Sequence, residues 1–152
     1  MGFGIISAIE HCSPLSHSGQ KMKQENIFGA ITSAIAYLED SMEALAKKDE
    51  KKVAHFAWRA ASDLEYALFL FSLMHQDETE SSSWKLNPHT KQLEIGPLLI
   101  SAQDLLKEAK DDFEAGELHK AHKKTWMVRG HLLWVHDFLE KKRRKSEKTV
   151  SS

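Results

Sequence analysis

The feature that most constrains this chain is a helical pattern of apolar residues that occurs twice. In four segments, apolar or small residues recur every three or four positions, a spacing that places them on one face of an α-helix. Polar breaks at 47–50 and around Gly116 divide the segments into two pairs. The positions on the four faces are Ile31, Ala34, Leu38, Ser41 and Leu45; Val53, Ala57, Ala60, Leu64, Ala67 and Phe71; Leu99, Ala102, Leu106, Ala109 and Phe113; and Ala121, Thr125, Val128, Leu132, Val135 and Leu139.

The two pairs of segments coincide when the chain is shifted by 68 residues. This shift carries Leu64 onto Leu132. It also carries Trp58 onto Trp126, without a gap between the two matches. Two unrelated amphipathic hairpins of similar length could align in the same way, but the shared tryptophan, a rare residue, favours duplication of one helical hairpin.

A helical hairpin with one apolar stripe cannot bury that stripe alone, so the two hairpins are expected to pack on each other. The chain has 152 residues, a length typical of one domain. The sequence therefore predicts an all-α fold, an antiparallel four-helix bundle over 25–140 made of two duplicated helical hairpins at 25–76 and 95–140. In the central connection, turn residues at 87–90 lie between short apolar segments, which could form a small β-hairpin.

Both ends of the chain are expected to lie outside the bundle. Residues 1–24 are interpreted as a flexible leader, with Met1 and Met22 as alternative starts. The apolar stretch at 3–9 is too short to span a membrane, and no basic residue precedes it as in a secretory signal. Since no later stretch is apolar enough to cross a bilayer, a cytoplasmic location without membrane contact is expected. Residues 141–152 are interpreted as a basic disordered tail.

Charge and cysteine content exclude several classes of function. The net charge is −1, which gives no overall field toward nucleic acids or membranes. The charge is uneven, because five consecutive basic residues in the tail leave −6 on the rest of the chain. One cysteine, Cys12, allows neither a disulfide within the chain nor a multi-cysteine zinc site. The basic residues of the tail are Lys141, Lys142, Arg143, Arg144 and Lys145.

Metal and cofactor chemistry has little support in the sequence. Di-iron bundles need Glu-x-x-His on two helices, and this spacing does not occur in the chain. His119 and His122 are one turn apart, but no carboxylate stands one turn from either of them. The chain also contains no glycine-rich phosphate loop. We therefore expect no metal site and no cofactor.

Two arginines lie inside the most apolar helices, whereas lysines cover most of the surface. A guanidinium is preferred where a planar, partly buried contact is needed. Arg59 has Asp63 one turn further on, at a spacing that allows an ion pair. Arg129 has no acid at that spacing, and Glu65 on the equivalent helix is its natural partner. The first interpretation of both pairs is a structural one, as salt bridges that fix the packing register.

A stripe beside the core face of the last helix suggests a binding groove. It adjoins an equivalent stripe on the second helix, and the pair brings together two tryptophans, two histidines, an arginine and a glutamate. Tryptophan and arginine are the favoured anchors of protein interfaces. The alternative is ordinary packing at the rim of the core. The predicted binding residues are Trp58, Arg59, Asp63, Glu65, His122, Trp126 and Arg129, with His136 at the end of the stripe.

Three features of the second hairpin also occur together in a known superfamily. They are an Ala-x-x-x-Leu helix at Ala102–Leu106, a short turn at 115–117 and an alanine-containing helix with an aromatic residue at Ala121–Trp126. This arrangement resembles the HEPN superfamily of prokaryotic four-helix proteins, and small uncharacterised all-helical proteins of archaea are similar. The resemblance covers about residues 28–140.

The resemblance implies a metal-independent ribonuclease. HEPN ribonucleases carry an arginine that is followed, after four to six intervening residues, by a histidine. In this chain six residues lie between Arg129 and His136. In the family role, His136 would act in acid–base cleavage at the ribose 2′-hydroxyl, and Arg129 would stabilise charge on the phosphate. The chain departs from the pattern at Gly130, where the family usually has a polar residue. Along one helix the pair would also be separated by about 10 Å.

Three classes of function remain open. The leading one is a non-catalytic interaction module that presents the groove between Trp58 and Trp126 to a protein partner or to a second copy of itself. The second is the HEPN-like ribonuclease with Arg129 and His136 as catalytic residues. The third is a nucleic-acid accessory protein that binds phosphates through the basic tail, with an affinity that falls steeply as salt rises. An enzyme is the less favoured class, because the chain lacks other catalytic motifs.

Overall fold

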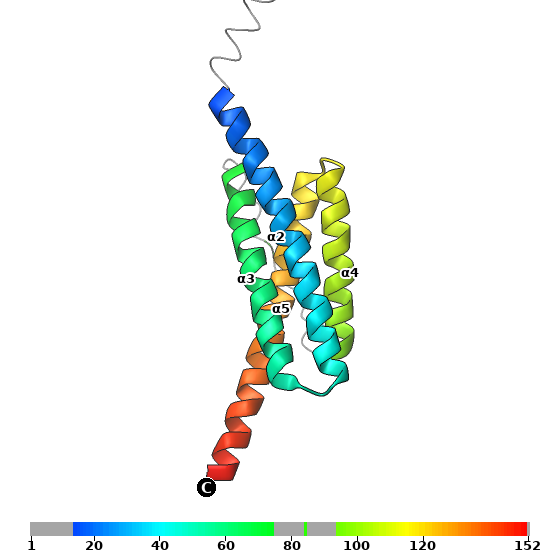
Figure 1. Ribbon diagram of the computed structural model, residues 1–152, viewed down its shortest axis with the longest axis vertical. Helices are drawn as coiled ribbons and strands as arrows, with labels where there is room; N and C mark the ends of the chain where they lie inside the picture. Colours follow the sequence, from blue (N-terminus) through cyan, green and yellow to red (C-terminus); the bar gives the residue numbers. More distant parts are fainter. Residues whose placement is uncertain (1–13, 75–83, 85–93, 152) are drawn as a thin grey trace, which may run out of the picture.

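The regular structure of this protein is entirely helical in the part of the chain that the structure describes. The computed structural model describes residues 14–74, 84 and 94–151, which form helices α2 (Pro14–Ala46), α3 (Glu50–Met74), α4 (Ile95–Glu114) and α5 (Leu118–Ser151) (Figure 1). The predicted all-α four-helix bundle is therefore confirmed. The β-hairpin considered at 87–90 lies outside the described residues.

The two hairpins pack side by side and in opposite orientations. Helices α2 and α5 run in one direction along the bundle, and α3 and α4 run in the other (Figure 1). Helix α2 contacts α3 and α4, and α5 also contacts α3 and α4, so every neighbouring pair is antiparallel. An approximate two-fold axis perpendicular to the bundle therefore relates the first hairpin to the second.

The core is made by the four faces that the periodicity predicted. Leu64 of α3 and Leu132 of α5, which the 68-residue shift superposes, are both fully buried. Half of the buried residues of α3 are alanines, and these small side chains let the neighbouring helices approach closely. The buried alanines of α3 are Ala54, Ala57, Ala60, Ala61 and Ala67.

Two polar residues on the predicted faces are buried as well. The Ser41 hydroxyl donates to the carbonyl of Leu38 at 2.8 Å. The Thr125 hydroxyl donates to the carbonyl of Ala121 at 2.7 Å. Both hydroxyls are therefore satisfied within their own helices, and they can occupy the core without an unpaired donor.

Both hairpin turns have the same backbone hydrogen bonds. In the first, Lys48 N–H donates to Leu45 O at 3.0 Å and Asp49 N–H donates to Ala44 O at 2.9 Å. In the second, the same two bonds occur 68 residues later, from the N–H groups of Gly116 and Glu117, at 3.1 and 2.8 Å. This pattern is the Schellman motif, which requires a residue with positive φ after the helix end. Lys48 (φ 59°) and Gly116 (φ 84°) fill that position, so the duplication seen in the core pattern extends to the turns.

Helices α2 and α5 are longer than the sequence predicted. The expected flexible leader ended at residue 24, but α2 begins at Pro14, a residue that suits the first turn of a helix. The expected disordered tail began at residue 141, but α5 continues to Ser151. The segment 141–151 contains neither glycine nor proline and is rich in good helix formers, so the helix has no local reason to stop at the edge of the bundle. Among residues 14–74 and 94–151, no helix has both the length and the apolar character needed to cross a bilayer.

The repeated turn allows a matched test of stability. A side chain at positive φ is strained, whereas glycine is not. We expect Lys48→Gly to raise the free energy of unfolding by about 0.5 kcal/mol and Gly116→Ala to lower it by about 1 kcal/mol. Urea unfolding monitored by circular dichroism measures both changes. Effects of equal sign in the two variants would contradict the assignment of one turn geometry to both hairpins.

Candidate functional site

An ion pair between α5 and α3 lies at the centre of the predicted binding stripe. The Arg129 guanidinium donates to a carboxylate oxygen of Glu65, as predicted from the lack of an acid near Arg129 in its own helix. The side chains of Arg129 and Glu65 are 29 % and 53 % exposed. A pair this exposed stabilises a fold by about 0–1 kcal/mol, so it fixes the orientation of the two side chains more than it stabilises the bundle.

Arg59 has a different partner from the one predicted. Its guanidinium donates to the Tyr37 hydroxyl of α2 at 3.0 Å and lies 5.4 Å from the centre of the Tyr37 ring. The hydrogen bond to Tyr37 raises the pKa of Arg59, and the charge of Asp63 adds a smaller effect in the same direction. Asp63 Oδ2 is buried and has no hydrogen-bond partner among the described residues. The expected Arg59–Asp63 pair is therefore replaced by a contact between helices.

His122 lies in an aromatic cluster at one end of the bundle. It is 7 % exposed and stacks on Phe71 of α3, with ring centres 5.0 Å apart. Trp84, from the connection between α3 and α4, packs edge-on against His122 at 4.8 Å and against Trp126 at 5.8 Å. Phe113 completes the cluster, 5.8 Å from Phe71.

This cluster closes one end of the predicted groove. Because Trp84 packs on Trp126 and buries His122, neither residue is presented as an open anchor. Trp58, which the two-fold relation makes equivalent to Trp126, remains 47 % exposed. Trp84 was not among the predicted binding residues, although a tryptophan within a polar connection is a signal that the residue packs against the bundle.

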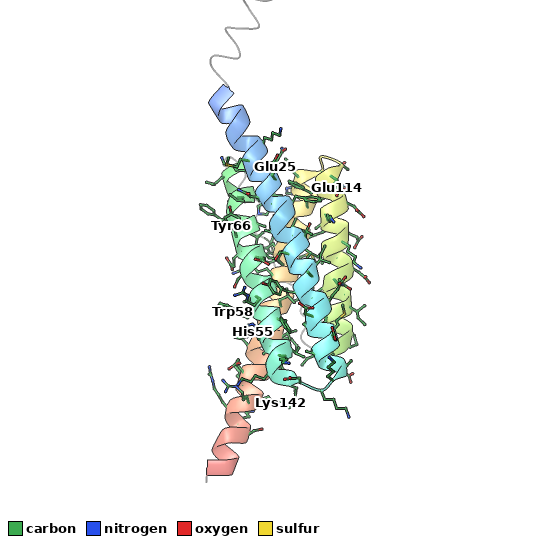
Figure 2. The ribbon with its side chains drawn as sticks, viewed as in Figure 1. Glu25, His55, Trp58, Tyr66, Glu114 and Lys142 are labelled. Atoms are coloured by element: carbon green, nitrogen blue, oxygen red, sulfur yellow. The ribbon has the colours of Figure 1, made fainter. Side chains whose placement is uncertain are left out.

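The open surface instead follows the outer side of α3. Six exposed residues lie together on that side of the helix, and we call them the α3 outer stripe. Three of them are large aromatics, with Trp58 47 %, Tyr66 48 % and Phe69 59 % exposed. Figure 2 shows His55, Trp58 and Tyr66 on the side of α3 that faces away from α2. The α3 outer stripe consists of His55, Trp58, Ser62, Glu65, Tyr66 and Phe69.

Tyr66 and Phe69 were not among the predicted binding residues. The sequence carried the signal, because positions 58, 62, 66 and 69 step by four, four and three on the side opposite the core face. The prediction followed the stripe that adjoins α5, where the tryptophans of the two hairpins coincide. The exposed aromatics extend from Trp58 along the face of α3 opposite the core.

Arg129 and His136 are each engaged in a separate structural contact. His136 Nδ1 lies 3.2 Å from the carbonyl oxygen of Ala54. This contact joins the middle of α5 to the first turns of α3. Arg129 holds Glu65. Both side chains are half-buried. Both residues that were predicted from the HEPN resemblance therefore join α5 to α3.

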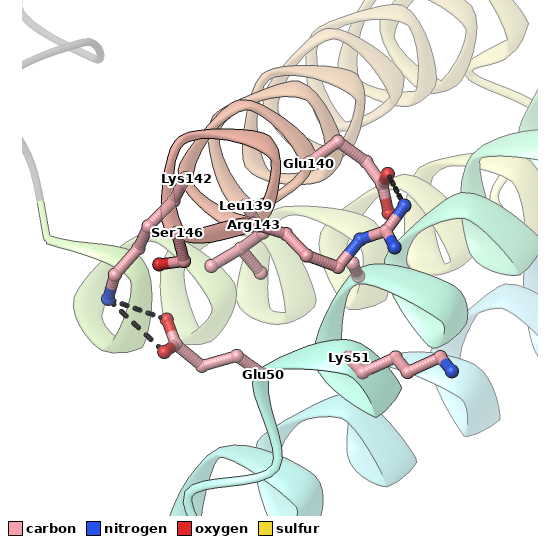
Figure 3. Close-up of a pocket in the computed structure, with 8 residues that line it drawn as sticks. Glu50, Lys51, Leu139, Glu140, Lys142, Arg143 and Ser146 are labelled. Carbon is pink, nitrogen blue, oxygen red and sulfur yellow. Dashed lines mark hydrogen bonds and ion pairs between the residues drawn. The ribbon is translucent and has the colours of Figure 1, made fainter. Parts of the chain in front are cut away.

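The basic residues 141–145 lie on the part of α5 that projects beyond the bundle. All five are exposed. Lys142 donates to the two carboxylate oxygens of Glu50 at 2.9 and 3.2 Å (Figure 3). Arg143 donates to Glu140 at 2.7 Å, and this hydrogen bond lowers the pKa of Glu140. These pairs border an open hollow of about 250 Å³ between the start of α3 and α5, lined by Glu50, Lys51, Ala54, Leu139, Glu140, Lys142, Arg143 and Ser146.

His131 of α5 is a buried polar residue of the second hairpin. It is 7 % exposed, and its Nδ1 has no hydrogen-bond partner among the described residues. Burial lowers the pKa of His131 below its ordinary value of 6.5, because the charged imidazolium loses its hydration inside the bundle. The folded protein therefore favours neutral His131.

A lowered pKa predicts that acid destabilises the fold. As the pH falls below about 6.5, the unfolded chain takes up the proton before the folded chain does. The contribution of His131 to the free energy of unfolding is therefore complete above that pH. It decreases as the pH falls toward the folded-state pKa of His131, by at most about 1.4 kcal/mol per pH unit. We expect His131→Gln to flatten this slope in urea unfolding measured between about pH 8 and pH 5. His55→Gln, at an exposed position, serves as the control, and equal slopes in the two variants would refute the assignment.

The described residues offer no cluster suited to a metal ion. Over 14–74, 84 and 94–151, no three His, Cys, Asp or Glu side chains come close enough together to hold one. Comparisons with protein-family models, with curated proteins and with solved structures find no match to this chain. The exposed surface of the bundle is therefore the feature that bears on function.

Proposed function

We propose that this protein is a non-catalytic interaction module that binds a protein surface through the α3 outer stripe. The observation that carries the proposal is the exposure of Trp58, Tyr66 and Phe69 on one side of a single helix. Large aromatic side chains that are rigid and half-exposed are typical anchors of protein interfaces.

The size of the apolar surface supports this proposal. An aromatic side chain offers 150–250 Å² for burial, so three that are half-exposed leave about 300 Å² open to solvent. Contiguous apolar surface of that size is often functional on a monomeric protein. His55, Ser62 and Glu65 provide a polar setting around the rings, as the rim of an interface does.

The contacts of Arg129 and His136 favour this proposal over the ribonuclease alternative. Each side chain has a structural partner on α3, namely Glu65 and the Ala54 carbonyl. A catalytic pair would need both side chains free to approach one phosphodiester. We also propose a cytoplasmic location, because a single cysteine, Cys12, is compatible with a reducing compartment and leaves no disulfide within the chain that would need an oxidising one.

Purification of the tagged protein from cells that produce it tests the proposal. We expect a stoichiometric protein partner, either another protein or a differently tagged second copy, to be retained by the wild type. The double variant Trp58→Ser, Phe69→Ser should lose it, because removal of two central aromatic anchors of an interface costs about 2 kcal/mol or more for each.

Ile100→Ser is the matched control. Ile100 is 54 % exposed on α4, so its substitution removes a similar apolar surface outside the α3 outer stripe. Circular dichroism confirms that each variant is folded. Equal recovery of the partner by the double variant and the wild type, or the absence of any stoichiometric protein, would overturn the proposal.

A second candidate function is nucleic-acid binding through the end of α5. The observation that favours it is the projection of this helix beyond the bundle with all five residues of 141–145 exposed (Figure 1). A continuous helix presents basic side chains in a fixed arrangement, which suits contact with a phosphate backbone. The internal pairs formed by Lys142 and Arg143 reduce the positive charge available there.

Binding to a labelled single-stranded RNA, followed by fluorescence anisotropy over a range of salt concentrations, tests this second candidate. Removal of one basic side chain that binds a phosphate should reduce the slope of log affinity against log salt by about 0.7 for a single strand. We expect the triple variant Lys141→Gln, Arg144→Gln, Lys145→Gln to reduce the slope by about 2. The control variant Lys47→Gln, Lys107→Gln, Lys123→Gln should leave the slope unchanged. Equal slopes in the two triple variants would exclude a binding role for the end of α5.

A further inference from the structure

The two halves of α3 carry different exposed side chains. Near its start, the exposed side includes Lys51, Lys52 and Arg59. Beyond the middle, it includes Glu65 and the rings of Tyr66 and Phe69. A basic half and a half with carboxylate and aromatic groups attract each other, through ion pairs and cation–π contacts. The helix is therefore complementary to a reversed copy of itself.

Ser62 is the centre of this complementarity. Arg59 precedes it by three residues and Glu65 follows it by three. Trp58 and Tyr66 are four residues away from Ser62 on either side, and the outermost pair of the stripe, His55 and Phe69, are seven away. Steps of three, four and seven keep all of these positions on one side of the helix. An antiparallel copy turned about an axis beside Ser62 therefore brings each of them to the level of its counterpart along the helix pair.

We infer that the partner of the α3 outer stripe is a second copy of this chain, docked antiparallel across a two-fold axis beside Ser62. The inference rests on the proposed function and names its partner. In such an interface each contact occurs twice, because both copies use the same surface. Trp58 of each copy packs on Tyr66 of the other across the axis, and Arg59 of each copy lies on the same flank as the Tyr66 ring of the other, where a cation–π contact can form.

The environment of each residue fits this arrangement. Ser62 is small, so two helices can approach closely at the axis, and its hydroxyl already donates to the Trp58 carbonyl at 3.0 Å. The Glu65 side chain is 53 % exposed while it holds Arg129, so this ion pair can persist at the edge of the interface. A parallel arrangement would instead place Lys51, Lys52 and Arg59 against the same residues of the other copy, and like charges would repel.

The buried area indicates a reversible dimer. The aromatic rings of the two copies contribute about 600 Å² together, and the polar residues of the stripe add to it. Stable protein interfaces bury about 1,200–2,000 Å² in total. The helix pair is therefore expected at or below the lower limit of that range, as a weak dimer whose population depends on protein concentration.

Sedimentation equilibrium and site-directed cross-linking test the inference on the full chain. We expect the apparent mass to rise from that of one chain, 17.3 kDa, toward twice that value as concentration increases. The Trp58→Ser, Phe69→Ser variant should remain monomeric, and the Ile100→Ser variant should behave as the wild type. In a Cys12→Ser background, Ser62→Cys should form a covalent dimer with a short bismaleimide.

Ser72→Cys is the matched control for cross-linking. Ser72 is also exposed on α3, but ten residues from Ser62, so in the antiparallel dimer its two copies are about 30 Å apart. Cross-linking at Ser72 as efficient as at Ser62 would overturn the antiparallel arrangement. A single-chain mass at all concentrations would overturn the second copy as partner. In that case the proposed function would still hold if purification of the tagged protein recovers a different protein as partner. The Ile100→Ser variant should then retain that partner, and the Trp58→Ser, Phe69→Ser variant should lose it.

Discussion

The contact between α3 and α5 is the constraint on which the rest of this structure depends. Neither hairpin can bury its apolar face alone, and these two helices share a more extensive contact than α2 and α4, the other pair that joins the hairpins. The small side chains of Ala54 and Ala61 at the edge of the α3 core face let α5 lie close. The ion pair of Arg129 with Glu65 and the contact of His136 with the Ala54 carbonyl then fix how the helices are oriented.

The 68-residue correspondence between the hairpins holds for buried core positions and for the hydrogen bonds of the turns, but it is broken at the surface. Trp58 and Trp126 occupy equivalent positions, yet only Trp126 is covered by Trp84. The chain has one connection of this kind, between α3 and α4, so it can supply that cover to only one of the two sites. Although the two hairpins are alike, Trp58 on α3 therefore stays exposed, because Trp84 of the connection covers only the equivalent position on α5.

The sequence predicted the bundle because periodicity reports which positions are buried. It also predicted the Arg129–Glu65 pair, since an arginine without an acid in its own helix needs one from a neighbour. It did not predict that Arg59 would donate a hydrogen bond to Tyr37 instead of pairing with Asp63. Spacing within one helix does not show which side chains of the adjacent helix lie within reach. The cover by Trp84 was missed for a similar reason, as no period relates a connection to the helix it packs on. The length of α5 was missed because helix propensity alone does not distinguish a projecting helix from a tail.

The repeated turn also bears on how the chain reaches this structure. Each hairpin closes through a turn at 47–49 or 115–117, so the contacts of α2 with α3 and of α4 with α5 join residues that are near in sequence. Such contacts require little loop-closure entropy and are typical of fast-folding helical proteins. Contacts between the hairpins must in addition close the longer connection between α3 and α4. We therefore expect hairpin formation to come first and docking of the two hairpins to limit the rate of folding.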